Sequence, residues 1–114
     1  GLSFKPKTDD VREAPAITII NLLKDMYASV AAYDPEASAQ AKAVLTGVDI
    51  VDNAYAALEG AHALLVLTEW DEFRTPDWGR MKAVMASPII IDGRNIYDPV
   101  TLRDAGWTYR SVGR

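Results

Sequence analysis

A chain of 114 residues, 49% hydrophobic and 25% charged, is long enough for one domain with a real core. Its net charge of -4 excludes the basic surface typical of nucleic-acid binding, and no apolar run approaches the ~20 residues of a membrane helix. The absence of cysteine excludes a disulfide, a thiolate nucleophile and a thiolate metal ligand within these residues. With no signal peptide visible, we expect a cytoplasmic protein.

Apolar runs alternate with amphipathic segments along the chain, which is typical of an α/β domain with a parallel sheet. The predicted strands cover residues 1–4, 30–33, 48–51, 63–67, 89–91 and 107–111, and the predicted helices cover 14–27, 35–45, 53–58, 76–85 and 99–105. Because the run at 63–67 is apolar throughout, we expect cover on both faces of its sheet. We therefore predict a three-layer, Rossmann-like α/β domain with a mostly parallel sheet and helices on both faces. The strands at 30–33, 63–67 and 89–91 are expected to be parallel neighbours in this sheet.

The chain opens at Gly1, without a methionine, and its first residues resemble the tail of a strand. We expect this first strand to lack its start, and residues 1–114 to be one domain of a longer protein. A glycine left behind by a tag is the alternative origin of Gly1.

The first two helices are expected to bury apolar faces. In the helix at 14–27 this face comprises Ala16, Ile19, Ile20, Leu23 and Tyr27, widened by Ile17, Leu22 and Met26. In the helix at 35–45 it comprises Ala37, Ala41, Val44 and Leu45.

Three helix starts share one device, in which a side-chain acceptor precedes a proline. The pairs are Asp34-Pro35, Thr75-Pro76 and Asp98-Pro99. The side-chain oxygen satisfies a free N–H of the first turn, and proline needs no acceptor there. We therefore predict Asp34, Thr75 and Asp98 as helix caps.

In an open parallel sheet, ligands bind beyond the carboxyl ends of the strands. Polar residues follow four predicted strands: Lys5, Lys7, Thr8, Asp9 and Asp10; Asp34; Thr68, Glu69 and Trp70; and Asp92, Gly93, Arg94 and Asn95. Lys5 and Arg94 are the cations best placed at this edge, and cations suit a nucleotide diphosphate. The alternatives are that Lys5 is a solvated surface lysine and that Arg94 only pairs with Asp92 or Asp98.

We expect structural roles for the charged residues between Thr8 and Pro15. Asp9 and Asp10 suit the positive start of a helix, and the sequence supplies too few further oxygen ligands for a hard metal ion. Arg12 and Glu13 are expected in salt bridges.

Glu69 and Trp70 are expected to have structural roles, and His62 is expected at the surface. Glu69 is a candidate general acid or base, but we favour a structural role for it and expect Trp70 to pack against a loop. His62 is the only histidine and stands at a strand start, at the edge opposite the candidate site. No Ser-His-Asp arrangement can be built from it.

Four motifs occur in a fixed order along the chain. They are Phe4-Lys5-Pro6-Lys7-Thr8-Asp9-Asp10-Val11-Arg12-Glu13-Ala14-Pro15, Tyr33-Asp34-Pro35, Thr68-Glu69-Trp70 with Glu72-Phe73, and Ile91-Asp92-Gly93-Arg94-Asn95. The ending from Gly106-Trp107-Thr108-Tyr109 to Gly113-Arg114 completes the pattern. Together they resemble the C-terminal UDP-binding domain of the UDP-glucose 6-dehydrogenase family, over essentially the whole chain. The Thr-Glu-Trp element favours this branch over the GDP-mannose and UDP-N-acetylmannosamine branches.

The resemblance implies the UDP-sugar-binding domain of a three-domain, homodimeric enzyme. Such an enzyme oxidises UDP-glucose to UDP-glucuronate with two NAD, which an N-terminal domain binds, and uses a cysteine nucleophile outside these residues. The family's substrate-binding Phe-Lys pair matches Phe4 and Lys5, and its substrate-binding arginine matches Arg94. The expected partners are UDP-glucose and the other domains of the enzyme. This chain carries no expected catalytic residue, cofactor-binding residue or metal ligand, and we expect it to be inactive alone.

A receiver-like signalling domain is the competing interpretation, because Asp9-Asp10 and Thr68 stand at comparable places. A receiver, however, needs a phospho-accepting aspartate ending its third strand and a lysine after its fifth. The chain has Asp52, which we interpret as a helix cap, and Asp92-Gly93-Arg94 at those places. A purely structural interaction domain with a vestigial pocket is a third alternative.

Overall fold

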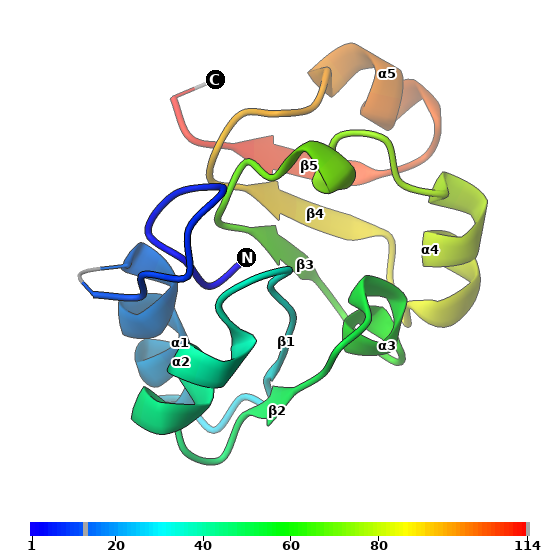
Figure 1. Cartoon of the computed structure of the whole chain (residues 1–114). Helices are drawn as coiled ribbons and strands as arrows, with labels where there is room; N and C mark the ends of the chain where they lie inside the picture. The colour runs from blue at the N-terminus through cyan, green and yellow to red at the C-terminus, as the bar shows by residue number, and fades with distance from the viewer. Residues whose placement is uncertain (13, 114) are drawn as a thin grey trace.

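The computed structural model describes residues 1–12 and 14–113, in which short strands alternate with helices (Figure 1). In chain order the elements are α1 (Pro15–Asp25), β1 (Ala31–Ala32), α2 (Ser38–Val44), β2 (Asp49–Ile50), α3 (Ala54–Leu58), β3 (Leu64–Val66), the 3₁₀ helix η1 (Asp71–Phe73), α4 (Trp78–Val84), β4 (Ile89–Asp92), α5 (Pro99–Asp104) and β5 (Thr108–Ser111). Glu13 and Arg114, which belong to motifs quoted above, lie outside the described residues. In the described part of the chain, no helix has the length and apolar character needed to cross a membrane.

The strands are parallel but form two sheets. β4 lies between β3 and β5, with Leu65 opposite Ile91, so the predicted pairing of the runs at 63–67 and 89–91 is confirmed. β1 pairs with β2 in a separate sheet. The prediction that the strand at 30–33 joins the other two in one sheet is therefore wrong.

Residues 1–4 form no strand, contrary to the prediction, although Leu2 and Ser3 are both buried. Their N–H groups donate to one carboxylate oxygen of Asp34, at 2.7 and 3.0 Å. The Thr68 hydroxyl donates to the Ser3 carbonyl at 3.1 Å. Side chains thus satisfy backbone groups that a neighbouring strand would otherwise bond. Residues 1–4 lie between the ends of β1 and β3 (Figure 1).

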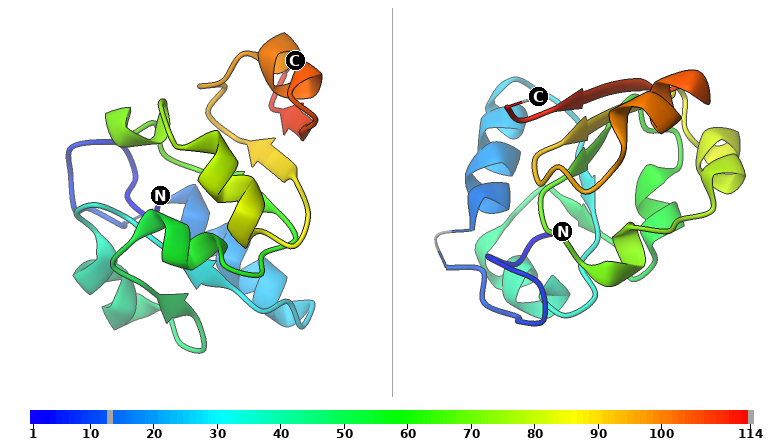
Figure 2. Two further views of the ribbon diagram at one scale, coloured as in Figure 1. Left: turned by 90° about the vertical axis from the view of Figure 1, so that its right-hand side faces the viewer. Right: turned by 90° about the horizontal axis from the view of Figure 1, so that it is seen from above.

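Two apolar clusters hold the helices to the strands. One packs α3, α4 and α5 against β3, β4 and β5, with Met81, Ile90, Leu102, Trp107 and Tyr109 at its centre. The other joins α1 and α2 to β1 and β2 (Figure 2). The predicted Rossmann-like α/β class is confirmed by this arrangement of parallel strands and covering helices. The cover is incomplete at Ile91, which is 42% exposed.

The apolar face of α1 is buried only in its first half. Ala16 and Ile20 are buried as predicted, whereas Leu22, Met26 and Tyr27 are exposed, Tyr27 by 97%. Leu22 lies within α1 on its exposed side, whereas for Met26 and Tyr27 the prediction fails because α1 ends at Asp25 and Tyr27 takes a left-handed conformation with φ 62°. This turn carries the last apolar side chains away from the core. In α2, Val44 is likewise exposed rather than inward.

The predicted helix caps are correct in one case. The Asp98 side chain caps α5 by accepting the Thr101 N–H. The cap of α4 is Asp77 rather than Thr75, because the helix starts two residues later than predicted. The cap of α3 is Asn53 and not Asp52.

Candidate functional site

Asp34 follows β1 and is the buried anchor of the N-terminal segment. One of its carboxylate oxygens accepts the N–H groups of Leu2 and Ser3 and the Trp70 indole N–H, the last at 3.3 Å. The other accepts two backbone N–H groups before α2, at 2.9 and 2.8 Å. Asp34 is therefore not the N-cap of α2, which is Ala37. Burial acts to raise the pKa of Asp34, but the backbone N–H donors outweigh it and hold this pKa below its ordinary value.

Asp92 ends β4 and holds the turn that carries Arg94. One carboxylate oxygen accepts the Arg94 N–H at 2.9 Å. The other accepts two backbone N–H groups of the turn, at 2.8 and 3.2 Å, and the Tyr109 hydroxyl at 2.7 Å. Gly93, between Asp92 and Arg94, lies so close to β3 that a Cβ would stand 3.2 Å from the Val66 carbonyl. The backbone of this turn is thus fixed by a fully buried carboxylate and a close packing contact.

The Arg94 side chain links three segments of the chain. Its Nε donates to the Leu67 carbonyl at 3.1 Å and its Nη2 donates to the Phe4 carbonyl at 3.1 Å. Its Nε also lies 3.2 Å from Oε2 of Glu69, with both side chains about one third exposed. The ionic partner is therefore Glu69, and the alternative pairing with Asp92 or Asp98 is wrong, since Asp92 bonds only the backbone of Arg94.

The three candidate substrate-binding residues come together at the carboxyl edge of the strands. Phe4 is 46% exposed, and its N–H donates to the Asp10 carbonyl at 2.7 Å, which closes the loop between them. Lys5 is exposed directly beside it, and the Ser3 hydroxyl donates to its carbonyl at 2.8 Å. Because Arg94 bonds the Phe4 carbonyl, this edge carries two cations and one exposed aromatic ring.

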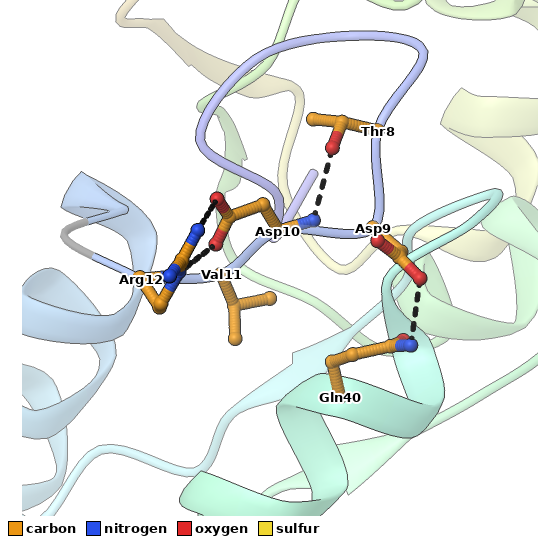
Figure 3. Close-up of a pocket in the computed structure, with 6 residues that line it drawn as sticks. All are labelled: Thr8, Asp9, Asp10, Val11, Arg12 and Gln40. Carbon is orange, nitrogen blue, oxygen red and sulfur yellow. Dashed lines mark hydrogen bonds and ion pairs between the residues drawn. The ribbon is translucent and has the colours of Figure 1, made fainter.

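A shallow hollow lies between residues 8–12 of this loop and α2 (Figure 3). Its lining residues are Thr8, Asp9, Asp10, Val11, Arg12 and Gln40, and none of the three candidate residues is among them. Its polar groups bond one another, as Figure 3 shows. Arg12 donates two N–H groups to the Asp10 carboxylate at 3.0 and 2.9 Å, and the Gln40 side chain donates to the Asp9 carboxylate at 2.8 Å. The bonds from Arg12 lower the pKa of Asp10 to about 2. These pairings favour the predicted structural role of the acids.

The residues that suggested a receiver are not arranged for phosphoryl transfer. Asp52 is exposed before α3, and Thr68 is fully buried with its hydroxyl bonded to the Ser3 carbonyl. Within residues 1–12 and 14–113, no group of three or more His, Cys, Asp or Glu is placed to hold a metal ion. His62 is exposed just before β3, at the opposite end of that strand from Thr68.

Sequence reasoning placed Asp34, Asp92 and Glu69 near the site but assigned none of them its observed contacts. For the two aspartates a signal was present, because each follows a predicted strand and precedes a Pro or Gly turn with several free N–H groups. Such a carboxylate has nearby donors to accept. For Glu69 no local signal exists, since its partner is 25 residues away in the chain.

Residues 1–99 match the UDP-binding domain of the UDP-glucose/GDP-mannose dehydrogenase family. The UDP-glucose 6-dehydrogenase of Rhizobium meliloti is 43% identical over 114 residues, which are 100% of this chain and 26% of that protein. TuaD of Bacillus subtilis, also a UDP-glucose 6-dehydrogenase, is 44% identical over 100% of this chain and 25% of its own length. The chain thus spans about a quarter of these relatives.

Solved structures of two dehydrogenases share the fold over the whole chain. The UDP-D-ManNAc dehydrogenase of Pyrococcus horikoshii superimposes with a TM-score of 0.78 at 31% identity, over 24% of its own length. The NDP-N-acetyl-D-galactosaminuronic acid dehydrogenase of Methanosarcina mazei superimposes with a TM-score of 0.84 at 30% identity, over 23% of its length. The overall fold of the chain therefore has counterparts in experimental structures.

Proposed function

The chain belongs to the UDP-glucose/GDP-mannose dehydrogenase family as its UDP-binding domain, and we propose that it binds the substrate of an NAD-dependent UDP-glucose 6-dehydrogenase. That enzyme oxidises UDP-glucose to UDP-glucuronate. The observation that carries the proposal is the meeting of Phe4, Lys5 and Arg94 at the carboxyl edge of the parallel strands. Ligands of open α/β sheets bind at this edge.

Each of the three residues has a chemistry suited to a UDP-sugar. The Lys5 ammonium and the Arg94 guanidinium offer charge-assisted N–H donors to the diphosphate. The exposed ring of Phe4 offers an apolar face to the base or the sugar. The carboxylates nearby are already bonded, Asp34 and Asp92 by backbone N–H groups, so they do not present free negative charge to the ligand.

The sequence identities to the relatives support glucose as the sugar. The relatives named for UDP-glucose are 43% and 44% identical, whereas the solved structures named for acetylated sugars are 31% and 30% identical. The Thr68-Glu69-Trp70 element points the same way. We therefore place the chain in the UDP-glucose branch.

The residues of this chain do not fit NAD. The glycine turn after β4 has its one glycine packed against the Val66 carbonyl, and the next helix, α5, begins only at Pro99. A dinucleotide site instead needs several glycines that open directly into a helix. We propose that NAD and the cysteine nucleophile belong to other domains of the same enzyme, which acts as a homodimer in the cytoplasm.

Calorimetric titration with UDP, UDP-glucose and GDP-mannose tests the proposal. We expect UDP and UDP-glucose to bind and GDP-mannose to bind more weakly. A protein that binds no uridine nucleotide would overturn the proposed function.

The Arg94→Ala variant tests the residue assignment in the full-length enzyme. Loss of a charge-assisted contact costs about 1.5–3 kcal/mol, so UDP-glucose should bind roughly ten- to a hundredfold more weakly. Arg94→Lys should rescue binding only partly if the contact is planar and two-pronged. NAD binding should be unchanged, and Arg110→Ala, which removes an exposed cation from β5, is the matched control. Unchanged UDP-glucose affinity in Arg94→Ala would leave Arg94 as a purely structural clamp.

A further inference from the structure

The three nitrogens of the Arg94 guanidinium have different surroundings. Nε faces the Glu69 carboxylate and the Leu67 carbonyl, and Nη2 bonds the Phe4 carbonyl. Among residues 1–12 and 14–113, Nη1 donates to no protein acceptor. Arginine binds phosphate oxygens through N–H groups in a fixed planar fork. The orientation of the guanidinium plane therefore decides whether its free donors point to a ligand.

Glu69 is itself held in place by its neighbours in the chain. The Thr68 hydroxyl before it bonds the Ser3 carbonyl, and the Trp70 indole after it bonds the buried Asp34. Its Oε2 is inaccessible to solvent and lies 3.2 Å from Arg94 Nε. A carboxylate fixed on both sides in this way holds the Nε side of the guanidinium.

We propose that Glu69 is a positioning residue for Arg94, which keeps the free guanidinium donors directed at an anionic ligand such as the diphosphate of UDP. The inference rests on the proposed function. Without the carboxylate, the guanidinium keeps only its two bonds to the Leu67 and Phe4 carbonyls, so a side chain that is one third exposed gains rotamer freedom that it must lose again on binding. A different role, in which Glu69 competes with the ligand for Arg94, predicts the opposite sign, because removal of a competitor tightens binding.

The test uses Glu69→Ala and Glu69→Gln in the full-length enzyme, each with and without Arg94→Ala, and measures the UDP affinity by calorimetry. We expect Glu69→Ala to weaken UDP binding by about two- to fivefold, the size of a partly exposed ion pair. We expect Glu69→Gln to fall between wild type and Glu69→Ala, because an amide oxygen beside Nε keeps a dipolar attraction but loses the charge of the ion pair. In the Arg94→Ala background, Glu69→Ala should have no effect, since it acts through Arg94.

The control is Glu72→Ala, three residues further along the chain in η1. Glu72 is exposed and accepts the Tyr33 hydroxyl, so its loss removes the same charge without touching Arg94. Tighter or unchanged UDP binding in Glu69→Ala would overturn the positioning role alone. Equal weakening in both Arg94 backgrounds would also overturn it, since that result shows a general structural effect. A wild-type enzyme that binds no UDP would instead overturn the proposed function itself.

Discussion

Asp34→Asn should destabilise the domain strongly, although it changes one atom. The amide can present its oxygen to only one of the two groups of donors that the carboxylate serves. If that oxygen faces Leu2, Ser3 and Trp70, the NH2 group faces the N–H of the fully buried Ala37.

The size of the effect follows from these contacts. One buried N–H without an acceptor costs about 1–3 kcal/mol, and the remaining bonds weaken from charged to neutral strength. We expect a total loss of about 2–4 kcal/mol, a large part of the typical ~5–15 kcal/mol stability of a domain. The free energy of unfolding is measured by urea titration, with tryptophan fluorescence and circular dichroism as independent probes. With a slope of ~1–3 kcal/mol per molar urea, the midpoint should fall by about 1–2 M.

The pH dependence of the free energy of unfolding is a second test of the role of Asp34. The pKa of Asp34 is lowered in the folded state, so its contribution is fully present above the ordinary value of 3.8 and is lost as the pH falls through the folded-state pKa. The gap between wild type and Asp34→Asn should therefore be largest near neutral pH and shrink below about pH 4. Asp25→Asn, which removes an exposed charge at the end of α1, should leave the midpoint within about 0.3 M of wild type. A similar small shift for Asp34→Asn would refute the role of Asp34 as a buried anchor.

Four further outcomes are expected. Tyr27→Gly should raise the free energy of unfolding by about 0.5–1 kcal/mol, because Tyr27 is 97% exposed and strained at φ 62°; a lower urea midpoint would contradict this. Gly93→Ala should lower it by about 1–3 kcal/mol, because the new Cβ meets the Val66 carbonyl at 3.2 Å; an unchanged midpoint would show that β3 and β4 can separate without cost. Tyr109→Phe should cost about 1–2 kcal/mol, because it removes a buried hydrogen bond to Asp92, and an unaltered midpoint would argue against that bond. The isolated chain should form no NADH from UDP-glucose and NAD, and any increase in absorbance at the NADH wavelength would contradict this.

Much of the fold follows from local patterns in the sequence. The continuous hydrophobicity of the runs at 63–67 and 89–91 predicted covered parallel strands, and β3 and β4 do pair in parallel, although Ile91 is 42% exposed. The N-terminal segment shows the limit of such patterns. Leu2 is buried, but its burial does not say which acceptor takes the backbone N–H groups. That acceptor is the side chain of Asp34, more than 30 residues away.

The candidate site was likewise predictable from the sequence only in part. The rule that ligands bind beyond strand ends predicted Lys5 and Arg94 at one edge, and the resemblance to the family added Phe4. The ion-pair partner of Arg94 was not predictable, because Asp92 and Asp98 are nearer in the chain than Glu69. Asp92 instead bonds backbone N–H groups of its own turn, and this leaves the guanidinium for the loop after β3. The helix periodicity that misplaced Tyr27 likewise contains no information on where a helix stops.

The division into two sheets has a consequence for how the domain opens. No strand pairing joins β1 and β2 to β3, β4 and β5 within the described residues, so each half can exchange its amide hydrogens in its own local opening. Phe4 and Lys5 belong to the segment that Asp34 ties to the first half, whereas Arg94 belongs to the second. A ligand that contacts all three spans the boundary. Its binding should therefore slow hydrogen exchange in β1 and β2 together with that in β4, and make the two halves unfold as one cooperative unit.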